Sequence, residues 1–530
     1  FACIERPAHI AALDAFARPA EHDGRGLVVT GESGGGKTAL LAAWTKKWAA
    51  AHPEHFVFQH YFGATPDSSS PDGFLRRLMG ELKARYKLTD EIPSDPEKLR
   101  DALPVWLAQT VGKGRILLVL DGLNQVRGSD ADSHLRFLPR FFPPHVTVIA
   151  SALSGPGLDA LAERGWATHD LPLASESEVD TMVGEYLRLL GRHVDAEGRP
   201  LQTPLRRQLA TAPACRNPLF LRTVLEELRQ FGSFEKLPER VNHYLKAATP
   251  KALFMAVIER WQEDFDGRNP NEASFDLTRR ALTHLWAARE GLSESEWLDL
   301  LGDRTSPLPR ALWTPLFLAL EPHLSQRSGL FAYGHDFLRA AVEEAFLKTA
   351  EARKAAHLAV ADYFERHASQ KEMTQRKAAE WPHQLRAAES WDRLEACLTD
   401  IPLFLALYND ETKWELTVYW MPLRKEPLNR DMGLCYSEAY RIWAASAANA
   451  EVGLVSSQIG LFLFENALFA EAEPLMRRAL KIYEQSYGEN HPDVAACLNN
   501  LAMLLKATNR LVEAEPLMRR ALKIDEQSYG

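Results

Sequence analysis

The chain has 530 residues, of which 46% are hydrophobic and 25% charged, ordinary proportions for packed globular protein that argue against a mostly disordered chain. At about 150 residues per domain, this length predicts about three or four domains. The formal net charge of −9 argues against a dominant basic face for nucleic acid or anionic lipid, so no nucleic-acid partner is expected.

The five cysteines form no Cys-x-x-Cys pair, which argues against a disulfide framework or a cysteine-based zinc site and favours a reducing, cytoplasmic location. No uncharged apolar run approaches the roughly 18–20 residues of a membrane helix, so no membrane partner is expected. The chain begins at Phe1 and ends at Gly530 inside an unfinished repeat. We therefore expect sequence to be missing at both ends.

The first third of the chain alternates short apolar runs with helical patterns. The runs are too short and too apolar for amphipathic helices and are predicted to be strands at 27–30, 56–58, 116–120 and 146–150, with a weaker one near 170–171. Strands that alternate with helices predict an α/β domain over 1–174, with a parallel sheet covered on both faces. The strand at 56–58 is expected to be inserted between 27–30 and 116–120.

Beyond residue 174 the strand signal fades. Segments 175–240 and 252–350 are predicted to be helical with Pro and Gly breaks, apart from a small β-wing expected at 328–333. From about residue 350 onward the pattern is almost all helical. Amphipathic helices are expected at 355–367 and 388–398. Breaks are expected at Pro402, Pro422 and Pro427.

The C-terminal end of the chain repeats itself. Residues 471–488 recur at 513–530 with 17 of 18 positions identical, which chance does not produce. This repeat predicts an α-solenoid of helical hairpins over 451–530, continuing beyond Gly530. The two copies start 42 residues apart, at 471 and 513, whereas the usual repeat of this helical-hairpin kind has about 34 residues. The extra length is expected in the turn at 486–492. The apolar positions expected between facing helices include Leu498, Leu501, Ala502, Leu505, Ala514, Met518 and Ala521.

Residues 31–38, GESGGGKT, match the phosphate-binding pattern G-x-x-x-x-G-K-[ST] between an apolar strand and a helix-forming run. Glycines let backbone N–H groups turn inward, and with the helix N-terminus these donors form an anion cradle. Lys37 supplies a charge to the β- and γ-phosphates, and Thr38 a hydroxyl for Mg²⁺. The alternative is a glycine-rich turn without a ligand. The predicted nucleotide contacts are Gly31, Ser33, Gly34, Gly35, Gly36, Lys37, Thr38 and Ala39.

The expected partner of this loop is a buried strand that ends in the carboxylate of Asp121. Asp121 is predicted to hold Mg²⁺ with Thr38, directly or through water; the alternative is an Asp-Gly turn that only ends the strand. Asn124 or Gln125 is a candidate to orient an attacking water, and Ser151 is a candidate to bind either that water or the γ-phosphate. With no second carboxylate at 122–125 and no arginine just after Ser151, we expect slow hydrolysis. The predicted catalytic residues are Lys37, Asp121, Asn124 and Ser151.

Together these motifs resemble the STAND NTPases, the NACHT and NLR-like signalling ATPases, with tetratricopeptide (TPR) repeats of the kinesin light chain type. FACIER at 1–6 resembles the family's motif before the P-loop domain, which implies that Ile4 and Arg6 approach adenine. NPLFL at 217–221 resembles the lid element whose proline, here Pro218, packs on adenine, although the family's glycine is absent. FAYGHDFL at 331–338 resembles the winged-helix segment whose histidine, here His335, contacts the β-phosphate of ADP.

The resemblance implies ATP or ADP with Mg²⁺ as cofactors, with ADP bound at rest. It implies ATP binding and homo-oligomerisation once the repeats sense a protein or peptide, an effector domain before Phe1, and antiphage defence signalling in bacteria. The implied domains are a P-loop nucleotide-binding domain at 1–174, a helical lid at 175–250, a winged-helix domain at 251–348, a helical linker at 349–450 and TPR repeats at 451–530.

Two other functions stay open at this point. The chain is alternatively a TPR interaction scaffold whose P-loop is vestigial or purely structural. A third alternative is a transcription regulator that places the winged helix on DNA. The absence of a basic helix cluster in 275–345 and the acidic net charge disfavour that third function.

Overall fold

The computed structural model describes residues 6–19, 22–63, 67–93, 96–126, 134–189, 204–230, 237–267, 275–303, 306–367, 370–409 and 412–529. The chain falls into two compact units. Unit 1 comprises Phe1–Asp264 and two short segments that return to it, Leu318–His323 and His335–Ala341. Unit 2 comprises Phe265–Phe317, Leu324–Gly334 and Val342–Gly530. Within the described residues, no helix combines the length and the apolar character needed to cross a membrane.

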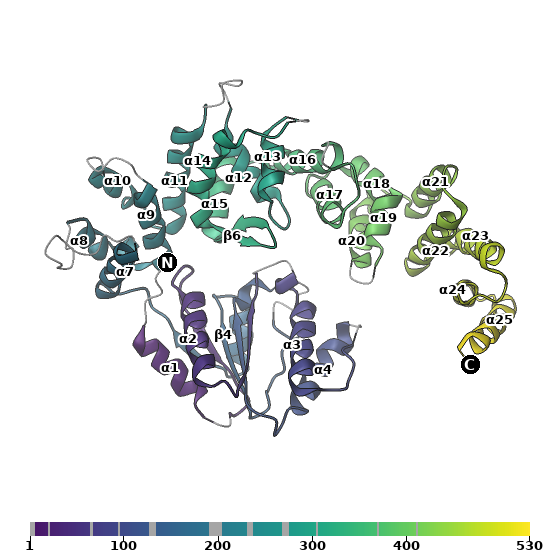
Figure 1. The fold of residues 1–530 in the computed structure, drawn as a ribbon, viewed down its shortest axis with the longest axis horizontal. Coiled ribbons are helices and arrows are strands. Elements are labelled where there is room, and N and C mark those ends of the chain that lie inside the picture. The colour runs from purple at the N-terminus through teal and green to yellow at the C-terminus, as the bar shows by residue number, and fades with distance from the viewer. Residues whose placement is uncertain are drawn as a thin grey trace. The chain divides into compact units, whose positions relative to one another are not determined.

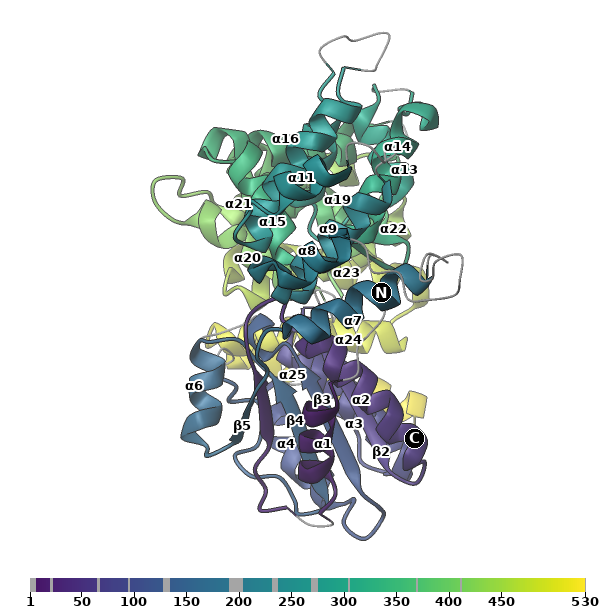
Figure 2. The ribbon, with the colours of Figure 1, turned by 90° about the vertical axis from the view of Figure 1, so that its left-hand side faces the viewer.

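Unit 1 begins with a parallel sheet whose strands lie in the order β2–β3–β4–β1–β5. Figure 2 shows β5 and β2 at opposite sides of this sheet. The predicted α/β class with a parallel sheet is confirmed. The strands are β1 (Leu27–Thr30), β2 (Phe56–Tyr61), β3 (Ile116–Asp121), β4 (Val146–Ser151) and β5 (Ala167–Asp170).

Helices cover both faces of the sheet (Figure 1). Successive residues of a strand point to opposite faces. In β3, Leu117 and Val119 therefore join the core under α1 and α2, whereas Leu118 and Leu120 join the core under α3 and α4. Burial on both sides explains why the strand is a continuous apolar run. The helices are α1 (Pro7–Ala17), α2 (Lys37–Ala51), α3 (Pro71–Tyr86), α4 (Pro96–Ala108) and α6 (Pro156–Glu163).

One prediction about the sheet is wrong. The strand between β1 and β3 is β4, whereas β2, which contains the predicted inserted strand at 56–58, lies at the edge. Burial explains the difference, because all six residues of β4 are buried and most of β2 is only partly buried. A strand buried at every position belongs inside a parallel sheet, whereas β2 carries the polar, partly buried Gln59.

A buried carboxylate ties together three of the helices that follow the sheet. Glu227 of α9 accepts hydrogen bonds from Arg260 Nε at 2.7 Å, Arg260 Nη2 at 3.0 Å and the Tyr244 hydroxyl at 2.6 Å. The Glu227 side chain is fully buried, so the guanidinium and the phenol satisfy a charge that solvent does not reach. The helices that follow the sheet are α7 (Glu176–Leu189), α8 (Pro204–Thr211), α9 (Pro218–Gln230), α10 (Leu237–Tyr244) and α11 (Pro250–Phe265), of which the last three share the Glu227 contacts.

Unit 2 contains an antiparallel hairpin that occupies the place of the expected β-wing. Its strands are β6 (Leu324–Arg327) and β7 (Leu330–Tyr333), with residues 328–329 as the turn. An isolated bridge pairs Leu292 with Phe331, which attaches the hairpin to the segment after α12. The helices before the hairpin are α12 (Leu277–Ala287), α13 (Glu294–Leu301) and α14 (Arg310–Leu320).

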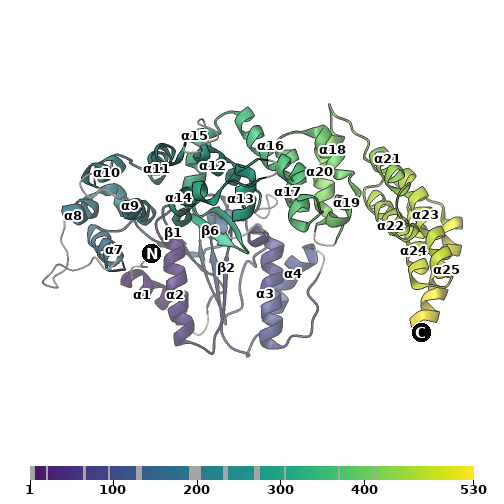
Figure 3. The same ribbon diagram turned by 45° about the horizontal axis from the view of Figure 1, so that its top comes forward.

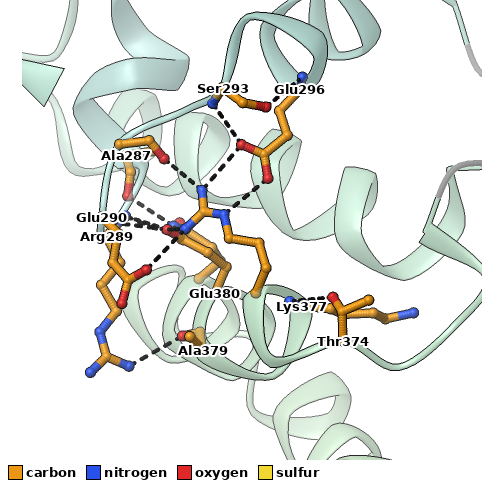
Figure 4. A network of polar contacts seen from close by, with 12 residues as sticks. Ala287, Arg289, Glu290, Ser293, Glu296, Thr374, Lys377, Ala379 and Glu380 are labelled. Carbon is orange, nitrogen blue, oxygen red and sulfur yellow. Dashed lines mark hydrogen bonds and ion pairs between the residues drawn. The ribbon is translucent and has the colours of Figure 1, made fainter. Parts of the chain in front are cut away.

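Charged side chains join the start of α13 to α17 (Gln375–Ala387), as Figure 4 shows. The fully buried Glu380 accepts hydrogen bonds from the backbone N–H groups of Arg289 at 3.0 Å and Glu290 at 3.1 Å. Arg376 donates to Glu380 at 2.8 Å and to Glu296 at 2.9 Å. Because each carboxylate has cationic or N–H partners, the network is satisfied despite its burial.

Two predictions about the remaining helices before the repeats are wrong. The helix expected at 388–398 begins at Trp391, because α17 ends at Ala387 and Glu389 adopts a φ of 54°. Pro422, expected to break a helix, lies inside α20, whereas Pro402 lies in the first turn of α19, where proline is tolerated. These helices are α15 (Asp336–Phe346), α16 (Ala350–Arg366), α18 (Trp391–Leu398), α19 (Ile401–Leu407), α20 (Lys413–Arg424) and α21 (Met432–Ala444).

The repeats form two helical hairpins in succession (Figure 3). They are built from α22 (Asn449–Glu465), α23 (Phe469–Tyr487), α24 (Pro492–Ala507) and α25 (Leu511–Tyr529). The predicted apolar positions are buried, except that Met518 is 37% exposed. The extra length expected in the turn at 486–492 partly extends α23 instead, which continues to Tyr487 and ends at Gly488 with φ 87°.

Candidate nucleotide site

The phosphate loop leaves the carboxyl end of β1 and enters α2 at Lys37. Gly34 and Gly36 have φ angles of 76° and 95°, a region in which a Cβ atom is strained. Gly36 is the N-cap of α2, and no side chain caps this helix. The N-terminal end of α2, where the helix dipole is positive, therefore faces the loop and suits an anion.

Lys37 folds over the loop that precedes it. Its Nζ donates hydrogen bonds to the carbonyl oxygens of Gly31 and Glu32, both at 2.8 Å. Burial lowers the pKa of Lys37, an effect that the carboxylates of Asp121 and Glu32 oppose. A buried ammonium that donates its two hydrogen bonds to neutral carbonyl groups suits a site that receives negative charge.

The carboxyl ends of β3 and β4 bring three predicted residues together. Thr38 Oγ1 donates to Asp121 Oδ2 at 2.7 Å, and Ser151 donates to the other carboxylate oxygen of Asp121. The Gly122 N–H donates to Ser151 Oγ at 2.9 Å. The adjacency follows from strand order, because β4 lies between β1 and β3. A hydroxyl and a carboxylate at this distance suit Mg²⁺, which prefers oxygen ligands.

Two of the candidates for orienting water, Ser151 and Asn124, are engaged elsewhere. Ser151 contacts Asp121 and Gly122, as described above, and Asn124 Oδ1 accepts the Leu153 N–H at 3.2 Å.

Tyr61, which pairs with Asp121 in the β2–β3 register, is a neighbour of the site that the motifs did not indicate. Burial and the Asp121 charge raise the pKa of Tyr61, whose hydroxyl donates to Gln59 at 2.7 Å.

Helix α9 begins directly on the phosphate loop. Asn217 Nδ2 donates to the Ser33 carbonyl at 3.1 Å, and the Leu219 N–H donates to the Gly34 carbonyl at 3.3 Å. The Asn217 side-chain oxygen also accepts the N–H of Leu219 at 3.0 Å, which caps α9. Pro218 lies close to Gly36, since a Cβ built on that glycine would sit 3.8 Å from Pro218 Cγ.

Arg6 connects the segment before α1 to the beginning of α7. Its Nε donates to Glu178 at 2.8 Å, and its Nη1 donates to the Pro172 carbonyl at 2.9 Å. Arg6 is 7% exposed. Partial burial opposes ionisation of Glu178, but hydrogen bonds from Arg6 and Ser175 prevail and lower its pKa to about 2. Arg6 thus holds the beginning of α7 in place. Ile4, which was predicted to approach adenine with Arg6, lies outside the described residues.

His335 lies in one of the segments that return to unit 1. Burial, assisted by the positive charge of Arg222, lowers the pKa of His335 to about 4, so its imidazole is neutral near pH 7. Arg222 of α9 donates to the Pro322 carbonyl at 3.0 Å. His335 is therefore close to the helix that begins on the phosphate loop, and its contact with a phosphate stays a prediction.

The structure gathers most of the predicted site at the carboxyl edge of the sheet. This edge suits a phosphate group with a metal ion, because the Lys37 ammonium and the N-terminus of α2 lie there while Thr38 and Asp121 offer oxygen ligands. Asn217 and Glu178 are contacts that the motifs indicated weakly or not at all. The predicted residues that lie together there are Gly31, Ser33, Gly34, Gly35, Gly36, Lys37, Thr38, Ala39, Asp121, Ser151 and Pro218.

Residues 2–149 match the family model described as an AAA ATPase domain, and residues 451–527 match that of the tetratricopeptide repeat. The chain carries an AAA ATPase domain followed by C-terminal TPR repeats. The ATPase domain and the TPR repeats that the sequence predicts are thereby confirmed. The matched ATPase segment includes the phosphate loop, Asp121 and the strands β1 to β3.

The chain is 27% identical over 510 residues to a TPR repeat-containing protein of Dictyostelium discoideum, covering 86% of this chain and 30% of that protein. It is 24% identical over 494 residues to nephrocystin-3 of Homo sapiens, covering 90% of this chain and 35% of that protein. The chain thus spans about a third of the length of these curated relatives. A solved structure of a STAND protein with a TPR sensor from Pyrococcus horikoshii shares 12% identity, with a TM-score of 0.44 over 99% of this chain and 77% of that one.

Proposed function

We propose that this chain is a nucleotide-gated signalling switch of the STAND kind. In this proposal ATP or ADP with Mg²⁺ binds at the phosphate loop and sets the position of the helical segment that begins with α9. The AAA ATPase domain, the TPR repeats and the resemblance of the motifs to STAND NTPases support it. We assign the domains as expected from the sequence, at 1–174, 175–250, 251–348, 349–450 and 451–530.

The observation that carries the proposal is that α9 starts on the phosphate loop. Two hydrogen bonds join its first residues to the carbonyl groups of Ser33 and Gly34. A shift of the loop backbone changes both bonds, and Glu227 passes the movement of α9 to Arg260 on α11. A nucleotide that favours one loop conformation therefore favours one position of these helices.

The residues of the site are arranged for holding phosphate better than for fast hydrolysis. A bound Mg²⁺–nucleotide supplies the phosphoanhydride bond and the charge that the loop neutralises. Lys37 and the start of α2 would hold the phosphates, and Thr38 and Asp121 would hold the metal ion. Because Asn124 and Ser151 already have backbone or carboxylate partners, neither is a ready base, and we propose slow turnover.

We propose further that the TPR repeats bind a protein or peptide in the cytoplasm, and that this ligand favours the ATP-bound, oligomeric form. An effector domain outside this chain would carry the output. Antiphage defence in a bacterium is the setting that the resemblance implies. The repeats support the interaction role, because hairpins in succession present an extended surface suited to a peptide.

Lys37→Ala tests the nucleotide part of the proposal. Removing the ammonium from a desolvated phosphate contact costs about 2–5 kcal/mol, so affinity for ADP falls roughly 30-fold or more. Lys46→Ala on the exposed side of the same helix is the matched control and leaves affinity unchanged. Isothermal titration with ADP and with ATP plus Mg²⁺ measures both variants.

The same measurement separates the switch from a TPR scaffold with a vestigial loop. A scaffold predicts that wild-type protein binds neither nucleotide, or that Lys37→Ala binds as well as wild type. A switch predicts tight binding by wild type, and a change in proteolytic cleavage around α9 between the ADP-bound and ATP-bound forms. The intact Lys37 contacts and the Thr38–Asp121 pair favour the switch.

A further inference from the structure

A turn at the C-terminal end of α2 gathers two imidazoles and a carboxylate. The His52 N–H donates to the Trp48 carbonyl at 2.9 Å and ends the helix, and β2 begins at Phe56. The His55 N–H donates to the His52 carbonyl at 3.1 Å, which closes a four-residue turn. Pro53 occupies the second position of this turn, where its fixed φ is favourable.

The closed turn brings three potential ligand atoms to one point. His52 Nδ1 lies 3.4 Å and His55 Nε2 lies 3.3 Å from the same oxygen, Oε1 of Glu54. One ligand atom from each residue lies within 4.8 Å of the other two. Zinc bonds of about 2.0–2.1 Å in a tetrahedron place neighbouring ligand atoms about 3.3–3.4 Å apart. Two edges of the cluster already have that length.

The surroundings of the turn hold the two imidazoles in place. The two imidazole rings stack at 4.8 Å with an interplanar angle of 7°, and the Trp48 indole contacts His52 at a centroid distance of 4.3 Å. The site lies at the negative end of the α2 dipole. The nearby guanidinium of Arg115 donates to the carbonyls of Ala17 at 2.7 Å and Pro19 at 2.5 Å, and its positive charge acts against a second cation near His55.

We propose that His52, Glu54 and His55 bind one divalent transition-metal ion of the zinc class, with water as the fourth ligand. Two imidazole nitrogens and one carboxylate oxygen suit Zn²⁺, whereas Mg²⁺ prefers oxygen alone. The 15 residues of α2 place this site roughly 20 Å from Lys37, so it is separate from the nucleotide site. A bound ion would join the end of α2 to the start of β2.

Zinc binding by the metal-free, untagged full chain tests this proposal. Competition with a chromogenic zinc chelator is compared among wild type, His52→Ala, His55→Ala and Glu54→Gln. His491→Ala is the matched control, because His491 has one acidic neighbour, Asp493 at 3.5 Å, and belongs to no three-residue cluster among the described residues. Wild type and the control are each expected to bind one zinc ion. Each cluster variant is expected to bind zinc with an affinity at least about 10-fold lower.

Cobalt provides an independent readout. Co²⁺ bound by wild type should show the visible absorption of a four-coordinate ion, and His55→Ala should lose it. His55→Gln and His52→Asn repeat the comparison with side chains of more similar size, and circular dichroism checks that each variant is folded. Equal zinc affinity and stoichiometry in wild type and all folded cluster variants would overturn the proposal, as would the absence of zinc binding by wild type.

Discussion

The contact between α9 and the phosphate loop can be tested with a single added methyl group. A Cβ built on Gly34 would lie 2.8 Å from Asn217 Oδ1 and 3.0 Å from Leu219 Cβ. Gly34→Ala should therefore push the start of α9 away from the loop and loosen the hydrogen bonds to Ser33 and Gly34. The expected result is faster amide exchange in α9 and weaker nucleotide binding.

A matched glycine separates the clash from backbone strain. Gly112 has a φ of 78°, against 76° for Gly34, and a Cβ built on it meets nothing within 4 Å. Both alanine variants carry about 1–2 kcal/mol of left-handed backbone strain. Only Gly34→Ala adds the overpacking cost of about 1–3 kcal/mol. The difference between the two variants therefore measures the contact with α9.

Hydrogen exchange followed by mass spectrometry reports on this contact locally, without assuming two-state unfolding of a chain with several domains. A local loss of about 1–3 kcal/mol corresponds to roughly 5- to 150-fold faster exchange for the peptide that begins at Asn217. Gly112→Ala should leave that peptide protected as in wild type. Equal protection in the two variants would refute the reasoning that the loop holds α9.

Two further predictions concern the contacts around the loop. Asn217→Ala removes the α9 cap and the hydrogen bond to Ser33, so α9 should lose about 1–3 kcal/mol of local stability. Asn217→Ser keeps a capping oxygen and should recover part of this loss. Limited proteolysis of α9 compares both variants with wild type, and equal cleavage of Asn217→Ala and wild type would contradict the prediction. The folded-state pKa of Glu178, about 2, lies below its ordinary value of 4.5, so the Arg6–Glu178 contact stabilises above about pH 4.5 and is lost as the pH falls toward 2. Acid unfolding of wild type and Glu178→Gln should therefore differ most above pH 4.5 and converge near pH 2; a constant gap would contradict this sign.

The sheet and the phosphate loop were predictable because their signals are local. A run such as 116–120 is apolar at every position, and a glycine-rich loop before a helix carries its own geometry. Strand order was harder, since both β2 and β4 fit the pattern of a strand. The polar, partly buried Gln59 in β2, against the fully buried β4, holds the information that places β2 at the edge.

Glu178, which no motif indicated, and Asn217, whose motif did not indicate its partner, act through contacts distant in sequence. Glu178 meets Arg6 across 172 positions, and Asn217 meets Ser33 across 184. A carboxylate in the first turn of a helix is ordinary for capping and dipole reasons, so Glu178 has no local signature of its partner. Asn217 likewise fits the role of an N-cap without the loop. Only the fold shows that both side chains have a second partner.

In the proposed switch, these distant contacts would couple the phosphate loop to the helices that follow the sheet. Lys37 alone would make the site an anion cradle, and the nucleotide would affect little beyond α2. Asn217 shares one side chain between the cap of α9 and the carbonyl of Ser33, so the loop cannot move without disturbing the first turn of that helix. Glu227, in the same helix, carries the buried pair with Arg260. A switch needs such a continuous chain of satisfied polar contacts, because each link that moves alone leaves a buried group unpaired.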